Sequence, residues 1–249
     1  MRQSLKGKDY GMNPEFRNRG EEQTRVETLS DAVFALAVTL LVLSSTVPTN
    51  FKELVDSFDN IIPFGICITL LMIIWYQHYI FFIRYGFKDV KIVAMNTLLL
   101  FLTLIYVYPL KFLFTILYKI NVGMFTSDKE LINEVFQKTI SVQDTSTLMV
   151  VYGMGAATVF IVLGIMYMIA LNRSKALELT PLEIFHTKTN MYNNWIMAAI
   201  PLLSTLVAMF SGPNGFFFAG ITYWLYGITM PLFHSLRKKR KKKLFPVGT

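Results

Sequence analysis

The chain has few of the residues that build disulfides, metal clusters and catalytic centres. Its single cysteine, Cys67, excludes an intrachain disulfide and a thiolate metal cluster. Because Cys67 lies inside an apolar run, we expect a small buried hydrophobic side chain there. The three histidines (His78, His186 and His234) are scattered, and neither a paired nucleophile nor a glycine-rich phosphate loop accompanies them. These gaps argue against an enzyme and predict neither a cofactor nor a bound metal.

Charge is also scarce, and long apolar runs take its place. Charged residues make up 16% of the 249 residues and hydrophobic residues 53%, whereas soluble domains carry about 25% charged residues. Six segments approach the roughly 20 residues that a helix needs to cross a bilayer: 29–47, 61–83, 92–110, 148–171, 194–210 and 216–233. The fifth is the shortest and contains Pro201. We therefore expect an all-α integral membrane protein with six transmembrane helices.

The distribution of Lys and Arg predicts how these helices are oriented. Nineteen of the 24 lie in the N-terminal segment, after the second and fourth spans, and in the tail "RKKRKKK"; four lie in the other connections, and Lys111 lies at the far end of the third span. By the positive-inside rule both termini are cytoplasmic. This gives a cytoplasmic segment at 1–24, a six-helix membrane domain at 25–236 and a basic cytoplasmic tail at 237–249. The polar start shows no cleavable signal, so the first span is expected to act as an uncleaved anchor.

Two segments outside the spans carry further patterns. At residues 126–140, Ser127 followed by Glu130 resembles a capping box. The apolar residues behind it share one helical face, which predicts a short external amphipathic helix. The basic tail is expected to contact anionic lipids, at about 1 kcal/mol per cation. After six spans this interpretation is favoured over nucleic-acid binding.

The first span, "RVETLSDAVFALAVTLLVL", has two different faces. At about 100° per residue, Leu36, Leu40 and Leu43 form one stripe, and Asp31 lies on roughly the opposite face beside small residues. The stripe either faces lipid or another helix, or lines a pore as a hydrophobic constriction that gates by dewetting. Periodicity alone leaves both possibilities open.

Asp31 predicts a polar network at the cytoplasmic end of the spans. A carboxylate at membrane depth is costly and faces protein or water. Arg25 precedes it by six residues, about 9 Å along a helix, so the two do not form a simple i, i+4 pair. Candidate partners at similar depth are Trp75, His78, Asn96, Asn190, Asn193 and Asn194. For His78, a structural role and a pH-sensing role both stay open.

The first span also carries a motif. Arg25-x-x-x-Leu29-Ser30-Asp31, followed by "AVFALAVTLLVL", resembles the Arg-x-x-x-Phe-Ser-Asp signature of the transmembrane protein 175 family of potassium channels. Six spans, cytoplasmic termini and the set Trp75, His78 and Asn96 are also similar to that family. Leu29 departs from the signature, which puts in doubt the aromatic packing that phenylalanine provides there.

The resemblance implies a prokaryotic, single-repeat channel that assembles as a homotetramer in a bacterial or archaeal inner membrane. It implies a pore lined by the first helix, with potassium as the permeant ion and no re-entrant selectivity loop. Aliphatic residues form the narrowest point in that family, and Leu36, Leu40 and Leu43 occupy the matching positions. The polar motif is implied to hold helices together without touching the ion.

A leucine ring offers no oxygen to a cation, so the selectivity needs another source. Our hypothesis is that Leu36 forms the gate and that the hydroxyl of Thr39 contacts a partly hydrated ion, giving modest selectivity. The alternative for Thr39 is a hydrogen bond to the carbonyl one turn earlier. The rival functions are a secondary transporter and a proton-permeable cation pathway of the same topology. The nearly uncharged middles of the spans argue mildly against a transporter.

Overall fold

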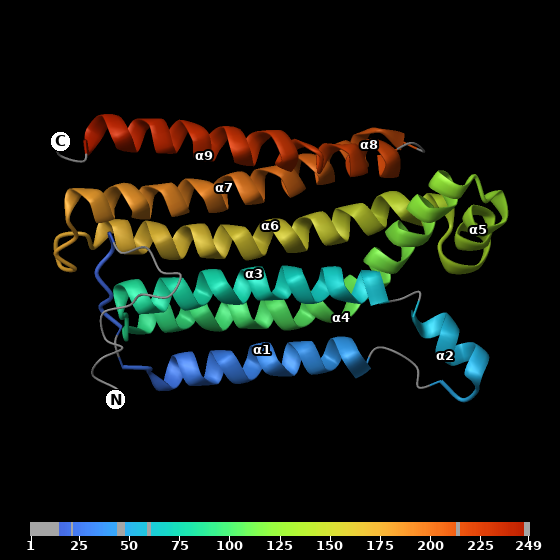
Figure 1. Cartoon of the computed structure of the whole chain (residues 1–249), viewed down its shortest axis with the longest axis horizontal. Coiled ribbons are helices and arrows are strands. Elements are labelled where there is room, and N and C mark those ends of the chain that lie inside the picture. The colour runs from blue at the N-terminus through green and yellow to red at the C-terminus, as the bar shows by residue number, and fades with distance from the viewer. Residues whose placement is uncertain (1–14, 21, 44–47, 59–60, 213–214, 247–249) are drawn as a thin grey trace.

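The computed structural model describes residues 15–20, 22–43, 48–58, 61–212 and 215–246, and nearly all of them are helical (Figure 1). No β-strand occurs in these ranges. The helices are α1 (Arg25–Leu43), α2 (Phe51–Phe58), α3 (Ile61–Tyr85), α4 (Val90–Thr126), α5 (Lys129–Glu134), α6 (Val142–Asn172), α7 (Pro181–Phe210), α8 (Gly215–Thr222) and α9 (Leu225–Leu244). A π-helical turn, Val135–Thr139, continues α5.

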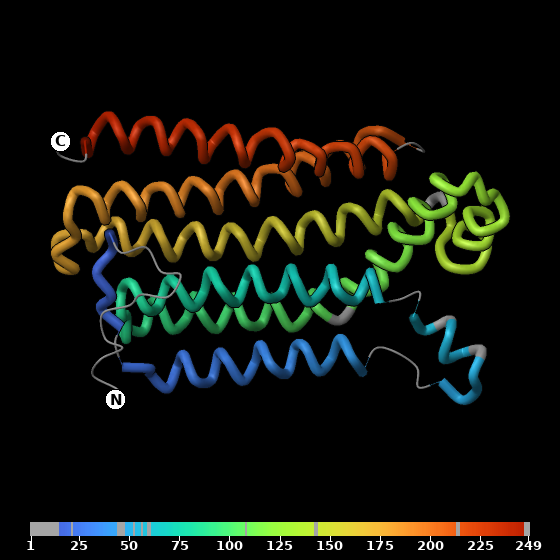
Figure 2. Tube along the Cα trace, viewed as in Figure 1, coloured from blue at the N-terminus to red at the C-terminus, as the bar shows by residue number. Residues whose placement is uncertain are grey.

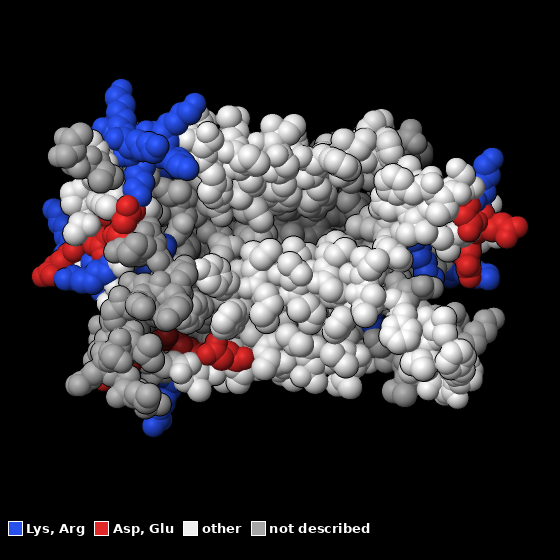
Figure 3. Space-filling model, in the orientation of Figure 1, with Lys and Arg blue, Asp and Glu red and all other residues white. Residues whose placement is uncertain are grey.

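Six stretches of helix are long and apolar enough to cross a membrane, which confirms the predicted fold class. They run side by side, with α1 at one edge of the view and α9 at the other (Figure 2). The described N- and C-terminal residues lie at the same end of the bundle, called here the terminal end. Lys, Arg, Asp and Glu gather at the two ends of the visible face and leave a broad, nearly uncharged band between them (Figure 3).

Several predicted spans differ from the helices that form, and the fifth and sixth differ in how they begin or continue. The fifth was expected over 194–210, but α7 begins at Pro181. Thr180 accepts a hydrogen bond from the Glu183 amide and Glu183 reaches back to the Thr180 amide, so a capping box starts the helix well before its apolar part. The sixth is interrupted after Thr222, and its second half, α9, continues through the basic residues to Leu244.

The α4 helix also exceeds its predicted bounds of 92–110. It extends over 37 residues with Pro109 inside it, and its path bends in the second half (Figure 1). Proline removes one helical hydrogen bond, and the Tyr152 hydroxyl of α6 donates to the Pro109 carbonyl. Because α4 reaches Thr126, the capping box predicted at Ser127 is wrong. Ser127 ends α4 in the left-handed conformation, and Asp128 caps α5.

Helix packing divides the core into three clusters. The largest joins α3, α6 and α7 around Phe81, Leu163 and Tyr167 at the terminal end. A second buries Phe34 and Leu41 of α1 against α3 and α4, and it includes Cys67, which is free and buried as expected. A third lies at the opposite end, where α4, α6, α7 and α8 meet. The α1 helix therefore contacts the bundle through one side only.

Candidate functional site

The α1 helix buries one face and exposes another. Its buried residues, Ser30, Phe34, Ala37 and Leu41, follow the spacing of a single helical stripe. The other side carries apolar side chains that nothing in the chain covers: Leu36 is 50% exposed and Leu43 is 71% exposed. Leu40, on the flank, is half-buried. Leu36, Thr39 and Leu43 define the exposed face of α1, and α1 itself lies at the edge of the bundle (Figure 1).

Thr39 lies between the two exposed leucines. Its hydroxyl donates to the carbonyl of Ala35, one turn earlier, with an O···O distance of 3.0 Å. The hydrogen of the hydroxyl is therefore directed to the backbone, and the lone pairs of its oxygen stay available on an exposed side chain. The backbone bond and an ion contact are compatible, because a cation requires the oxygen as an acceptor only.

Three buried polar residues form a chain of hydrogen bonds from α1 to α4 to α3. The Ser30 hydroxyl donates to the Val26 carbonyl (2.8 Å), so its oxygen accepts from the Asn96 amide group (2.9 Å). The carbonyl oxygen of Asn96 then faces His78 Nε2 at 2.8 Å, which makes Nε2 the proton-bearing nitrogen. Ser30, His78 and Asn96 are each at most 2% exposed. The contacts fasten α1 to its two neighbours.

Asp31 joins α1 to α3 by a separate contact. Trp75 Nε1 donates to one carboxylate oxygen at 2.8 Å, and Gln23 Nε2 donates to the other at 2.9 Å. The hydrogen bonds turn the carboxylate away from the exposed face of α1, as the helical wheel predicts. Gln23 lies in the polar stretch before α1, where sequence patterns gave no reason to single it out.

Four of the candidate partners lie elsewhere. Arg25 is exposed, and within the described ranges its side chain forms neither an ion pair nor a hydrogen bond. Asn194 is buried in α7 and donates to the carbonyl of Asn190 in its own helix (2.9 Å). Among the described residues, no hydrogen bond joins Asn190, Asn193 or Asn194 to the network on α1.

The segment before α1 is fixed by a buried ion pair that sequence reasoning missed. Arg19 binds both carboxylate oxygens of Glu183 on α7, at 3.0 and 2.8 Å. The side chains are 11% and 2% exposed. The Arg17 amide and the Thr180 amide donate to the same carboxylate. A polar N-terminal segment has no periodicity, and Glu183 is the usual residue of a capping box, so no sequence pattern linked Arg19 to Glu183.

The same segment also touches the basic helix α9. Glu15 accepts hydrogen bonds from His186 of α7 (3.0 Å) and from Lys241 of α9. Lys241 lowers the pKa of Glu15 below its usual range. The guanidinium carbon of Arg237 lies 4.0 Å from the centroid of the Phe185 ring, and the guanidinium donates a hydrogen bond to the Thr189 hydroxyl. The residues predicted as a basic tail therefore begin as a helix packed on α7.

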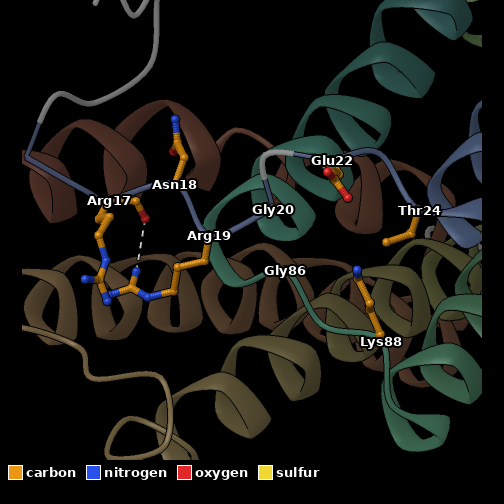
Figure 4. A pocket seen from close by; sticks show the side chains of 8 residues that line it. All are labelled: Arg17, Asn18, Arg19, Gly20, Glu22, Thr24, Gly86 and Lys88. Carbon is orange, nitrogen blue, oxygen red and sulfur yellow. Dashed lines mark hydrogen bonds between the residues drawn. The ribbon is translucent and has the colours of Figure 1, made fainter. Parts of the chain in front are cut away.

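A polar cavity of about 480 Å³ opens beside this segment. Arg17, Arg19, Glu22 and Lys88 contribute side chains to its wall, and Gly86 lies between α3 and α4 at its base (Figure 4). Gly86 has a φ of +58°, and an added Cβ would meet the Arg19 carbonyl at 2.8 Å. The close approach of the N-terminal segment thus requires glycine there.

A further ion pair lies at the terminal end and joins the residue after α6 to the N-cap of α4. Arg173, after α6, binds the Asp89 carboxylate at 2.5 and 3.1 Å, and Asp89 caps α4. The guanidinium lowers the pKa of Asp89 and the carboxylate raises that of Arg173. Within the described ranges, no group of three His, Cys, Asp or Glu side chains converges as a metal site.

Three comparisons with known proteins all relate this chain to one family of potassium channels. A family model described as "Endosomal/lysosomal potassium channel TMEM175" matches residues 25–109, which include α1 and the Ser30–Asn96–His78 chain. A potassium channel of Marivirga tractuosa is 44% identical over 240 residues, covering 94% of this chain and 95% of that protein. The crystal structure of a variant of the potassium channel MtTMEM175, in complex with a nanobody–MBP fusion, is 43% identical. It aligns with a TM-score of 0.80 over 92% of this chain and 99% of that chain.

Proposed function

The chain belongs to the TMEM175 family of potassium channels, and from this premise we propose that it conducts potassium along the exposed face of α1. The observation that carries the proposal is the division of α1 into two sides. Leu36 and Leu43 are exposed on one, while Asp31 is hydrogen-bonded to Trp75 away from it. An ion moving along this face meets side chains that neither bind it tightly nor repel it by charge.

Several copies are needed to enclose such a path. A single α1 at the edge of the bundle supplies one wall, so we propose that four copies surround the pore, as the resemblance implies. The exposed apolar side chains of α1 would then be covered by one another. The contacts from Ser30, Asn96 and His78 would hold each α1 in register against its own subunit.

We further propose that Leu36 forms the gate and that Thr39 contributes the modest selectivity. A ring of leucines gives a dehydrated cation no oxygen ligand, so conduction through it requires water in the constriction. Thr39 lies one turn beyond Leu36, and its oxygen is free to accept from the hydration shell or contact the ion. Leu40 and Leu43 continue the apolar wall.

The membrane orientation follows from charge. We propose that the terminal end faces the cytoplasm of a bacterial or archaeal cell, because nineteen of the 24 Lys and Arg residues of the sequence lie in the N-terminal segment, after the second and fourth spans and in the tail, and four lie in the other connections. The exposed cations of α9 would then contact anionic lipids of the inner leaflet. Arg237 and Lys241 are partly engaged within the chain, so the remaining cations carry this contact.

The experiment is ion flux in liposomes under a potassium gradient and then a sodium gradient. We expect Leu36→Ala to raise flux or to lower the preference for potassium, because the constriction widens. We expect Thr39→Val, which keeps the shape and removes the oxygen, to lower the preference for potassium. The matched control is Leu206→Ala on α7, a leucine of nearly equal exposure (52%) far from α1 in sequence.

Three results would count against the proposal. If folded protein conducts no ions in liposomes, the proposed channel function is contradicted. Flux indifferent to Leu36→Ala would place the constriction elsewhere on α1. Flux that couples stoichiometrically to a second ion, or carries protons alone, would favour the transporter or the proton-permeable pathway.

A further inference from the structure

Arg25, the first residue of α1, takes no part in the contacts that fasten α1 to the bundle. It belongs to the same motif as Ser30 and Asp31, yet the hydrogen bonds of those two residues form without it. Its side chain is exposed, and among the described residues it has neither an ion-pair partner nor a hydrogen-bond acceptor. The packing of a single subunit therefore does not explain this cation.

The start of a helix is also an unfavourable place for a cation. The helix dipole places partial positive charge at the N-terminus, so acidic side chains stabilise the first turn and basic ones destabilise it. The two acids of α1 do not compensate, because Glu27 lies about 160° and Asp31 about 120° around the helix from Arg25, at about 100° per residue. Both carboxylates accept hydrogen bonds elsewhere, from Thr24 and Trp75 respectively. The charge of Arg25 thus finds no compensation in its own subunit among the described residues.

Arg25 lies on the exposed face of α1, in line with the side chains proposed to border the pore. On the helical wheel it falls within about 20° of Leu36 and at the same angle as Leu43. Exposed residues continue this line at alternating spacings of four and three, which average 3.5 and keep side chains on one face. They are Arg25, Leu29, Ala32, Leu36, Thr39 and Leu43. The arginine is therefore the first member of the exposed face of α1.

The position of Arg25 along this face is at its terminal end (Figure 1). Arg25 precedes Leu36 by 11 residues, which corresponds to about 16 Å along the helix axis. When several copies place the exposed face of α1 around one axis, the Leu36 side chains lie deep in the path. The Arg25 side chains then surround its opening at the terminal end.

We propose that Arg25 lines the mouth of the conduction path at the terminal end and that its charge limits the entry of potassium from that side. This role rests on the proposed function, because only an assembly of copies turns one exposed arginine per subunit into a ring of charge. The ring lowers the concentration of potassium at the mouth, whereas ions that arrive from the opposite end reach the leucines first. The current is therefore smaller in one direction than in the other.

The salt concentration sets the size of this effect. Charges about 10 Å from the axis act across a Debye length of about 30 Å at about 0.01 M salt, whereas at about 1 M that length is about 3 Å. Four such charges should reduce the current from the terminal end by about threefold in dilute salt and by less than about 1.5-fold at about 1 M. A steric effect of the side chain has no such dependence on salt.

The test is the single-channel current of the reconstituted full-length protein in planar bilayers, at both signs of the voltage. It is recorded in about 10 mM and about 1 M potassium chloride. The ratio of the larger to the smaller current is the readout, because it does not depend on the direction in which a channel inserts. We expect this ratio to fall in Arg25→Gln in dilute salt only, and to stay at the wild-type value in Arg25→Lys, which keeps the charge.

The matched control is Lys91→Gln at the start of α4, because Lys91 is also an exposed cation in the first turn of a helix. We expect this control to keep the wild-type ratio. A second variant, Arg25→Cys, changes the charge in a channel that has already folded, and the buried Cys67 provides a nearly silent background. A positively charged thiol reagent should restore the wild-type ratio in this variant, and a negatively charged reagent should raise the current from the terminal end.

Four results would overturn the proposal. A conducting Arg25→Gln channel with the wild-type ratio removes this role and leaves the proposed function intact, whereas a wild type that conducts no ions contradicts both. An equal change at both salt concentrations, or an equal change in Lys91→Gln, shows that charge at the mouth is not the cause. Loss of the assembled protein in both Arg25→Gln and Arg25→Lys shows that the guanidinium instead joins neighbouring copies.

Discussion

The hydrogen-bond chain from Ser30 through Asn96 to His78 makes a quantitative prediction about stability. Asn96→Ala removes the Asn96–Ser30 and Asn96–His78 bonds, each worth about 1 kcal/mol. It also leaves the buried Nε2–H of His78 without an acceptor, which costs on the order of 1–3 kcal/mol. Because all three side chains are at most 2% exposed, water cannot replace the bonds freely. We expect the free energy of unfolding to fall by about 3–5 kcal/mol.

The assay is reversible unfolding in mixed micelles, followed by circular dichroism at fixed protein concentration. Thr103→Val is the matched control: Thr103 is also 2% exposed and on α4, but its hydroxyl bonds only to Leu99 of its own helix. The control keeps the side-chain shape and should cost at most about 1 kcal/mol. An equal loss in both variants would refute the reasoning.

A double-mutant cycle isolates the interaction. In His78→Phe the new ring remains among the neighbouring rings of Phe34 and Phe82, and Asn96 loses its donor. Once His78 is absent, Asn96→Ala no longer strands a buried N–H group. The combined loss should therefore be smaller than the sum by about 1–2 kcal/mol. Additive losses would show that the two residues act independently.

Three more predictions concern the rest of the bundle. Asp89→Asn keeps the cap of α4 and removes the pair with Arg173. Because the pKa of Asp89 is lowered in the folded state, the pair stabilises above the ordinary pKa of an aspartate, and that contribution is lost as pH falls through the lowered value. Melting curves should show a small wild-type advantage, about 0–1 kcal/mol, at neutral pH and none in acid; an advantage that grows in acid contradicts this. Gly155→Ala would place Cβ 2.1 Å from the Tyr106 ring, and we expect a loss of about 1–3 kcal/mol in the unfolding assay; an unchanged stability would show that the ring moves freely. Glu183→Ala leaves the buried guanidinium beside it unpaired and should cost about 3–5 kcal/mol, with proteolysis before α1 as a second readout; resistance equal to wild type would argue that the pair does not fix this segment.

The sequence was sufficient to locate the six apolar spans, though not all of their ends, and to separate the faces of α1. Hydropathy located six apolar stretches, because the bilayer requires them to be long and nearly uncharged. The helical wheel separated Leu36 from Asp31, because periodicity in a straight helix depends only on spacing. Both inferences are local, and both describe the helices that form.

The failures come from contacts between distant segments. The start of α7 is polar, so hydropathy placed it outside the span, but Glu183 is buried by Arg19, 164 residues away in sequence. The Ser127 prediction failed because α4 extends past its bend at Pro109, and a local pattern could not show that the Tyr152 hydroxyl of α6 donates to the Pro109 carbonyl. No pattern in the sequence tied the N-terminal segment to α7 and α9.

The most direct test of the central claim is thiol accessibility during ion flux. Cys67 is buried, so the wild type provides a nearly silent background for single cysteine substitutions. We predict that a charged thiol reagent blocks potassium flux in Leu36→Cys, Thr39→Cys and Leu43→Cys, and leaves flux unchanged in Leu206→Cys. A pore along the exposed face of α1 would be contradicted if the reagent blocked flux in Leu206→Cys and left flux unchanged in all three α1 variants.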